Sequence, residues 1–123
     1  MEVRAMEIDY YTDGRGRQEV YEWVLEAATR DVKTFNRFTI MKNFLKANGE
    51  EIRTQKLPHP DIKYFKGEKV WQLRIHDHRV MFFYFEDDTI VFLNHFVKKQ
   101  GPTPTAEKNR AKKNKAKHIN RKP

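Results

Sequence analysis

The sequence of 123 residues contains no cysteine and no serine. Without cysteine, disulfides, thiolate metal sites and cysteine nucleophiles are excluded. Without serine, the serine hydrolases are excluded. No apolar run approaches the roughly 20 residues that a membrane-spanning helix needs, and the N-terminal sequence MEVRAMEIDYY lacks the apolar segment of a signal peptide. We therefore expect a cytoplasmic protein that does not bind membranes.

The positive charge is concentrated at one end of the chain. The formal net charge is +8, and the residues from Lys98 onward carry ten Lys and Arg against the single acid Glu107, a balance of +9, so the first 97 residues carry −1. This asymmetry favours nucleic acid or another polyanion as the partner, and the alternative is a solvated basic tail. An aromatic content of 13% argues against disorder through most of the length. We expect one domain over residues 1–118 and a disordered basic tail over residues 119–123.

The first half of the sequence predicts a strand followed by two helices. Residues 6–12 (MEIDYYT) are typical of a short strand that ends in a Gly-containing turn. Residues 17–48 have apolar side chains at helical spacing, and Asp31 can cap a second helix within this range. Gly49 is expected to end that helix. Residues 48–69 contain two prolines and many charges, so they are expected to form a connection and not a strand.

Residues 70–100 predict three consecutive antiparallel strands. Two-residue turns are expected at Asp77-His78 and at Asp87-Asp88. An apolar set then shares the face that should meet the helices: Trp71, Leu73, Ile75, Val80, Phe82 and Tyr84. The opposite face is expected to mix polar and aromatic side chains: Gln72, Arg74, His76, Arg79, Asn94, Lys98, Phe83, Phe85, Phe92 and Phe96. A slip of one residue in either turn would exchange the two faces.

The segment after these strands is competent to form a basic helix. Thr103 can cap a helix that begins at Pro104, and Glu107 lies in its first turn, where a negative charge suits the helix dipole. The helix over residues 104–118 would have almost no apolar residues. We therefore expect a surface helix, or one that forms fully only against a partner.

Basic side chains near the predicted turns point to a phosphate site. Arg74 and Arg79 flank the first turn, and Lys98 and Lys99 follow the last strand. The guanidinium group presents a rigid fork of donors that fits phosphate oxygens, whereas the alternative is a set of charges kept for solubility. His95 lies in an apolar run beside the lysine pair. It is therefore either a satisfied core histidine or a general acid or base.

His76-Asp77-His78 raises the question of a metal site. Two histidines separated by one residue lie on the same side of a strand, but a metal normally needs three ligands, and no further cluster lies nearby in the sequence. A turn favoured by Asp77 is the preferred interpretation. We expect neither a metal nor a cofactor.

Several of these features occur together in a known family. The order of three elements resembles the HigB-like, phage-related (Gp49-like) branch of the RelE/ParE toxin superfamily. These elements are Trp71-Gln72-Leu73-Arg74, then Arg79 at the start of an aromatic-rich strand, then His95-Phe96-Val97-Lys98-Lys99 before a Pro-containing link. The match is strongest over residues 57–111. The resemblance implies an α+β, RelE-like compact domain. In it an N-terminal strand and a helical hairpin pack on one side of an antiparallel-dominated sheet, RNA lies on the other side, and a basic helix follows.

The resemblance also implies a function. It implies the toxin of a type II toxin–antitoxin system, a metal-independent mRNA endoribonuclease (mRNA interferase) that acts on the ribosome and inhibits translation. A HigA-like helix-turn-helix antitoxin would hold it inactive in a hetero-oligomer. By position, Arg74 and Arg79 match the family's strand arginines, and Lys98 and Lys99 match its basic pair, while His95 completes the candidate catalytic set. Further side chains are expected to bind RNA: Lys66, Lys69, His76, His78, Lys112 and Lys113.

The sequence departs from RelE at three positions. Thr105 stands at about the place of a C-terminal tyrosine that helps the chemistry, and Val70 and Gln72 stand in place of paired strand lysines. The general base must then be another group, either His95 or a lysine. Two alternatives stay open, a non-catalytic basic module that binds RNA or the ribosome, and a degenerate toxin that only binds its antitoxin.

Overall fold

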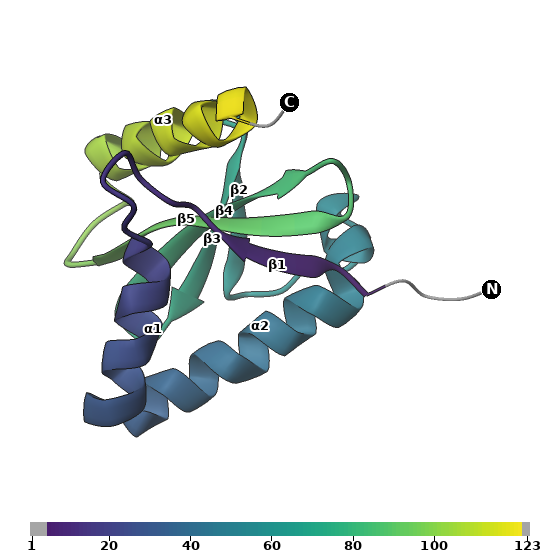
Figure 1. Ribbon diagram of the computed structural model, residues 1–123. Coiled ribbons are helices and arrows are strands. Elements are labelled where there is room, and N and C mark those ends of the chain that lie inside the picture. Colours follow the sequence, from purple (N-terminus) through teal and green to yellow (C-terminus); the bar gives the residue numbers. More distant parts are fainter. Residues whose placement is uncertain (1–4, 122–123) are drawn as a thin grey trace.

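A five-stranded sheet lies between two helices on one face and one helix on the other, in a computed structural model that describes residues 5–121 (Figure 1). The sheet order is β1-β5-β4-β3-β2, with β1 parallel to β5 and the other pairs antiparallel. This confirms the predicted α+β class. The elements follow in the order β1 (Glu7–Tyr10), α1 (Glu19–Arg30), α2 (Val32–Arg53), β2 (Ile62–Phe65), β3 (Val70–Ile75), β4 (His78–Phe85), β5 (Thr89–Val97) and α3 (Thr105–Arg121).

Asp31 separates α1 from α2, as its sequence position predicts. Its backbone N–H donates to the carbonyl oxygen of Ala27 and so closes the last turn of α1. Its carboxylate accepts hydrogen bonds from the backbone N–H of Thr34 at 3.2 Å and from the Thr34 hydroxyl at 2.7 Å. A carboxylate at this position satisfies an unpaired N–H and lies at the positive end of the helix dipole.

The prediction that Gly49 ends α2 is wrong. The helix passes through a kink at Asn48 (φ −123°) and continues to Arg53. Gly49 is needed for a close approach and not for a cap, because a Cβ atom at this position would lie 2.4 Å from Cγ of Met6. The backbone N–H of Met6 donates to the carbonyl oxygen of Lys46 at 2.9 Å, which ties the segment before β1 to the same turn of α2.

The expected connection over residues 48–69 contains an edge strand, β2, so that prediction is also wrong. β2 pairs antiparallel with β3 and places Tyr64 opposite Trp71, with ring centroids 4.8 Å apart. β2 has only four residues and lies close to prolines and lysines. Its alternating pattern is therefore too short to identify a strand from the sequence. Lysine and a short length are also what protects an edge strand from pairing with other chains.

Both turns differ from the predicted ones. Ile75 pairs with His78, so the first loop is His76-Asp77, with His76 at φ +55°. The second loop has three residues, 86–88, because Phe85 pairs with Thr89. The first turn is displaced by one residue but keeps its length of two, so the pairing register moves by two residues and the predicted faces are kept, whereas a change of one residue in register would exchange them.

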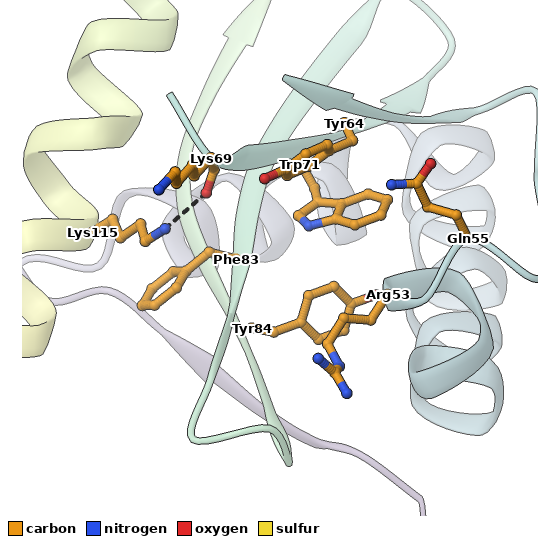
Figure 2. Close-up of a pocket in the computed structure, with 8 residues that line it drawn as sticks. All are labelled: Arg53, Gln55, Tyr64, Lys69, Trp71, Phe83, Tyr84 and Lys115. Carbon is orange, nitrogen blue, oxygen red and sulfur yellow. Dashed lines mark hydrogen bonds between the residues drawn. The ribbon is translucent and has the colours of Figure 1, made fainter. Parts of the chain in front are cut away.

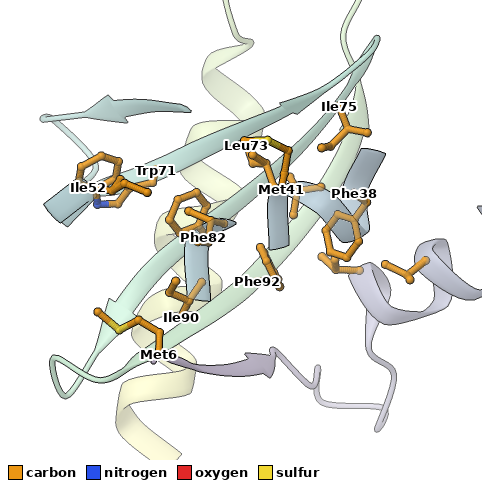
Figure 3. Packing of buried hydrophobic residues seen from close by; sticks show 14 residues of the cluster. Met6, Phe38, Met41, Ile52, Trp71, Leu73, Ile75, Phe82, Ile90 and Phe92 are labelled. Atoms are coloured by element: carbon orange, nitrogen blue, oxygen red, sulfur yellow. The ribbon is translucent and has the colours of Figure 1, made fainter. Parts of the chain in front are cut away.

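The face toward α1 and α2 carries the main core (Figure 3). It contains the predicted apolar set, with Tyr84 at its margin. Phe92 lies on this face as well, although the sequence places it on the other. The three-residue second loop causes the exchange, because it pairs Phe92 with Phe82 and not with Phe83. A β-bulge then restores the predicted register, because Met81 pairs with Asn94 and Leu93 is left as the extra residue. The helices contribute further buried side chains: Val20, Val24, Phe38, Met41, Leu45 and Ile52.

Helix α3 crosses the opposite face, so the centre of the face expected to hold RNA is filled (Figure 1). Ala111 is fully buried against the sheet, where its small side chain allows a close approach. The helix includes residues 119–121 of the segment expected to be a disordered tail, and residues 122–123 lie outside the described part of the chain. Within residues 5–121, no helix has the length and apolar composition of a membrane span. The sheet residues under α3 are Val70, Met81, Phe83, Val91, Leu93 and Phe96.

Candidate functional site

The β3–β4 hairpin gathers most of the predicted catalytic residues at one end of the sheet. Arg74 and Arg79 lie directly opposite each other across the two strands. The end of β5 joins them, because Val97 pairs with His78 and the backbone N–H of Lys98 donates to the carbonyl oxygen of Asp77 at 2.8 Å. We call this region the turn end, defined by residues 74–79 and 95–99.

Arg79 is a buried residue that holds the hairpin turn. Its side chain is 8% exposed. Its Nη1 group donates to the carbonyl oxygens of His76 at 2.7 Å and His78 at 2.9 Å, while its Nε atom has no partner among the described residues. Burial, and then the nearby Arg74, lower the pKa of its guanidinium, which nevertheless stays charged. Arg79 therefore positions the turn and offers little surface to a phosphate group.

Arg74 is exposed and shares a carboxylate with a second arginine. Asp61 Oδ1 accepts from Arg74 Nε at 2.8 Å and lies 2.7 Å from its Nη2, while Asp61 Oδ2 accepts from Arg37 Nη2 at 2.7 Å. Burial alone would raise the pKa of Asp61, but hydrogen bonds from the two arginines outweigh it and lower the pKa. One carboxylate between two guanidinium groups leaves a net charge of +1 at this surface. The sequence does not indicate that Arg37 and Asp61 interact, because 24 residues separate them.

His78 and His95 form a hydrogen-bonded pair. Nδ1 of His78 lies 2.9 Å from Nε2 of His95, so one ring donates and the other accepts. The His95 ring stacks on Trp23 of α1, with centroids 4.3 Å apart and planes 17° apart. Burial, and then the positive charge that His78 can carry, lower the pKa of His95 to about 4. His95 is therefore a neutral imidazole at pH 7, which fits a proton acceptor better than a proton donor.

The backbone of His95 is fixed from both layers of helices. Its N–H donates to Oε2 of Glu19 at 2.7 Å, and its carbonyl oxygen accepts from Arg110 of α3 at 3.2 Å. Arg110 also donates to Glu19 at 2.5 and 3.0 Å and to Glu107 at 3.0 Å. This network links α1, β5 and α3, and it holds the histidine pair in place through contacts that the sequence does not indicate.

His76 belongs to the turn end and points toward α2. Its Nδ1 atom lies 3.2 Å from the Thr34 hydroxyl, which itself donates to Asp31. Because the single hydroxyl hydrogen is directed at Asp31, Nδ1 of His76 must be the donor to Thr34 Oγ. Among the described residues, no three His, Cys, Asp or Glu side chains are arranged to hold a metal ion.

The remaining predicted RNA-binding lysines lie away from the turn end. Lys66 and Lys69 are in the β2–β3 turn, at the other end of β3. At a rise of about 3.3 Å per strand residue, Lys69 lies about 16 Å from Arg74 along β3. Lys112 and Lys113 are exposed on α3. The structure therefore divides the predicted basic residues among three regions: the turn end, the β2–β3 turn and α3.

Comparison with known families assigns the chain to a group. The family described as phage-derived protein Gp49-like matches residues 41–116, which is more than half of the chain. No curated protein matches the chain. The protein belongs to the Gp49-like family, which is toxin–antitoxin-associated and RelE/HigB-like in general.

Proposed function

We propose that this protein is the toxin of a type II toxin–antitoxin pair and that it cleaves mRNA without a metal ion. One observation supports this most strongly. A hydrogen-bonded histidine pair, one ring of which is neutral at pH 7, lies at the same end of the sheet as an arginine pair with net positive charge, of which Arg74 is exposed. Proton transfer and phosphate binding are the two tasks that RNA cleavage asks of a protein.

The reaction needs no nucleophile from the protein. The ribose 2′-oxygen forms a bond to the adjacent phosphorus, and the bond from phosphorus to the 5′-oxygen of the next nucleotide breaks. The 2′-hydroxyl proton passes to the His78–His95 pair, and the leaving 5′-oxygen takes a proton from the ammonium group of Lys98 or Lys99. The products carry a 2′,3′-cyclic phosphate and a 5′-hydroxyl group, so atoms and charges balance.

The turn-end residues divide these roles. Arg74 is exposed and would neutralise charge on the phosphate, with Arg37 beside it. Trp23 and the Glu19–His95 hydrogen bond position the histidine pair. Arg79 holds the turn that precedes His78 and acts as a positioning residue. His95 accepts the proton only through the pair, because its Nε2 atom is already hydrogen-bonded.

The family suggests an antitoxin partner. We propose that the substrate is mRNA on the ribosome in the cytoplasm, and that a HigA-like helix-turn-helix antitoxin silences the toxin in a hetero-oligomer. The exposed lysines of α3 would steer an acidic partner toward the toxin. The antitoxin can silence the toxin by covering the turn end or by adding bulk that prevents entry to the ribosome.

The test is cleavage of a defined mRNA by purified protein, with and without ribosomes, in the wild type and in His78→Asn and Arg74→Gln variants. Loss of one well-placed group is expected to lower the rate by about 10² to 10³. Arg30→Gln is the matched control, because it removes an equal charge from a side chain that is 80% exposed on α1. Because ribosomes need magnesium, the metal requirement is tested with chelator on a ribosome-independent substrate, where cleavage is expected to persist. Absence of cleavage in every condition, or equal cleavage by all variants, would contradict the proposal.

A degenerate toxin that only binds its antitoxin is the second candidate. Two observations favour it: Arg79 is buried and Arg74 is engaged with Asp61. Such a protein would bind the antitoxin with unchanged affinity in the His78→Asn variant and would release no 5′-hydroxyl ends from any RNA.

A further inference from the structure

A hollow lies at the other end of β3, away from the turn end. It has a volume of about 310 Å³, at the lower end of the range for small-molecule pockets. The end of α2, the β2–β3 edge, the end of β4 and α3 surround it (Figure 2). We call it the edge pocket. Its lining residues are Arg53, Gln55, Tyr64, Lys69, Trp71, Phe83, Tyr84 and Lys115.

One side of the edge pocket is aromatic. The ring of Trp71 lies 4.8 Å from that of Tyr64 and 5.7 Å from that of Tyr84, measured between centroids. The pairing of β3 with β4 reaches only to Trp71 and Phe82, so Phe83 and Tyr84 extend past it. The Tyr84 hydroxyl is buried and has no hydrogen-bond partner among the described residues. Tyr64 is the exposed ring of this group, while Trp71 behind it is buried. The exposed Tyr64 ring, backed by Trp71, is suited to stacking with a planar heteroaromatic ligand.

The opposite side of the edge pocket is cationic. Lys115 Nζ donates to the carbonyl oxygen of Lys69 at 2.8 Å and lies 5.4 Å from the Phe83 ring centroid (Figure 2). Burial, and then the charge of Lys69, lower the pKa of Lys115, and a bound anion would reverse that effect. Within the described residues neither lysine has a salt bridge, whereas Arg53 is engaged by Glu50 at 2.7 Å. The two lysines are therefore available to an anion.

The same alternation of cations and rings continues along β2. The ammonium groups of Lys63 and Lys108 lie 5.1 and 5.2 Å from the centroid of the Phe65 ring. Aromatic platforms beside a basic track are typical of proteins that bind single-stranded nucleic acid, because bases stack on the rings while lysines follow the backbone. A peptide ligand would give no reason for this repeated pairing of rings with cations.

We propose that the edge pocket binds one unpaired nucleotide of an RNA strand, with the base against Tyr64 and Trp71 and the phosphate between Lys69 and Lys115. The proposal rests on the proposed function, in that it takes RNA as the substrate. It gives the RNA a second point of attachment. At a rise of about 3.3 Å per strand residue, this point lies about 16 Å from Arg74 along β3. Two attachment points would fix the position of the strand at the turn end.

The experiment measures binding alone. The probe is a single-stranded six-nucleotide 2′-O-methyl RNA with a fluorescent label, which cannot be cleaved because its 2′-oxygens are blocked. An abasic strand of equal length carries the same phosphates without bases. Anisotropy titration of the wild type is expected to give about tenfold tighter binding of the strand with bases, the size that one stacked base supplies.

Two variants assign this difference to the edge pocket. Tyr64→Ala, on an exposed edge strand, is expected to bring the two strands to equal affinity. Lys115→Gln is expected to weaken both strands, and Lys117→Gln, which removes the same charge from an exposed position of the same helix, is the matched control. Lys69→Asn is likewise expected to weaken the binding of both strands. Asparagine is chosen because it tolerates the φ of +57° at this position.

Equal binding of the two strands by the wild type would overturn the proposal, as would a base-dependent difference that survives Tyr64→Ala. Unchanged RNA affinity together with lost antitoxin binding in Tyr64→Ala would assign the edge pocket to a protein partner and would also overturn it. Because the probe is not cleaved, a failure of the proposed catalysis leaves this measurement intact. The two proposals can therefore fail separately.

Discussion

Acidification is expected to destabilise the protein through His95. Burial lowers the pKa of this ring from 6.5 to about 4 in the folded protein, while the unfolded chain keeps the ordinary value. Between these two values the unfolded state binds a proton that the folded state does not. The free energy of unfolding must therefore fall as the pH drops from 6.5 toward 4, and the loss is absent above 6.5.

The size of the effect follows from the shift. One pKa unit corresponds to about 1.36 kcal/mol, and pH 5 lies about 1.5 units below the unfolded value of 6.5, which gives about 2 kcal/mol. The ring is partly accessible to water, which reduces the expected loss to about 1–2 kcal/mol. For a urea dependence of about 2 kcal/mol per molar, the unfolding midpoint would move by roughly 0.5–1 M.

The measurement is urea unfolding of the wild type and of His95→Gln at pH 7 and at pH 5. Circular dichroism is the suitable signal, because Trp23 stacks on His95 and its fluorescence would change with the substitution. The variant loses the hydrogen bond to His78 at both pH values, so only the change between them is compared. The wild type should lose about 1–2 kcal/mol more than the variant. Equal losses in the two proteins would refute the reasoning.

Three further predictions concern the helices. Gly49→Ala should cost about 1–3 kcal/mol of stability in urea unfolding, because its Cβ would lie 2.4 Å from Met6 Cγ; an unchanged midpoint would show that Met6 moves freely. Arg110→Gln should speed amide exchange in α3, since this side chain joins Glu19 to Glu107, and unaltered exchange would mean that the helix docks without it. Alanine at four α3 lysines should slow antitoxin association and flatten its salt dependence more than it reduces cleavage, and an untouched salt slope would make their charge irrelevant. These lysines are Lys112, Lys113, Lys115 and Lys117.

Local patterns were sufficient for much of the fold. Asp31 could be found because a helix cap is a local signal, and its side chain bonds only three residues ahead. The apolar face of the sheet could be found because alternation along β3 and β4 survives a shift of both strands by one residue. The length of the second loop could not, since Asp87-Asp88 suggests a two-residue turn while the loop has three residues, and Phe92 was placed on the wrong face as a result. Nothing in the sequence marks Leu93 as the extra residue of the β-bulge that restores the register.

The candidate site was predictable in part. The sequence pointed to Arg74 and Arg79, but it could not show that one is exposed and the other buried. Arg79 lies on a central strand between Arg74 and Phe96, whereas Arg74 lies beyond the end of the β2–β3 pairing, and this depends on the order of the strands. The contacts of His95 with Trp23 and Glu19 join residues more than 70 positions apart. Such contacts depend on how α1 packs on β5, and no periodicity in either segment encodes them.

The central claim is that the turn end cleaves mRNA, and mapping transcript ends after induction in a bacterium tests it most directly. The wild type is expected to generate new 5′-hydroxyl ends within coding sequences before growth stops. His78→Asn, at equal soluble level, is expected to generate none and to allow growth. Intact transcripts and normal growth at high soluble expression of the wild type would contradict the claim.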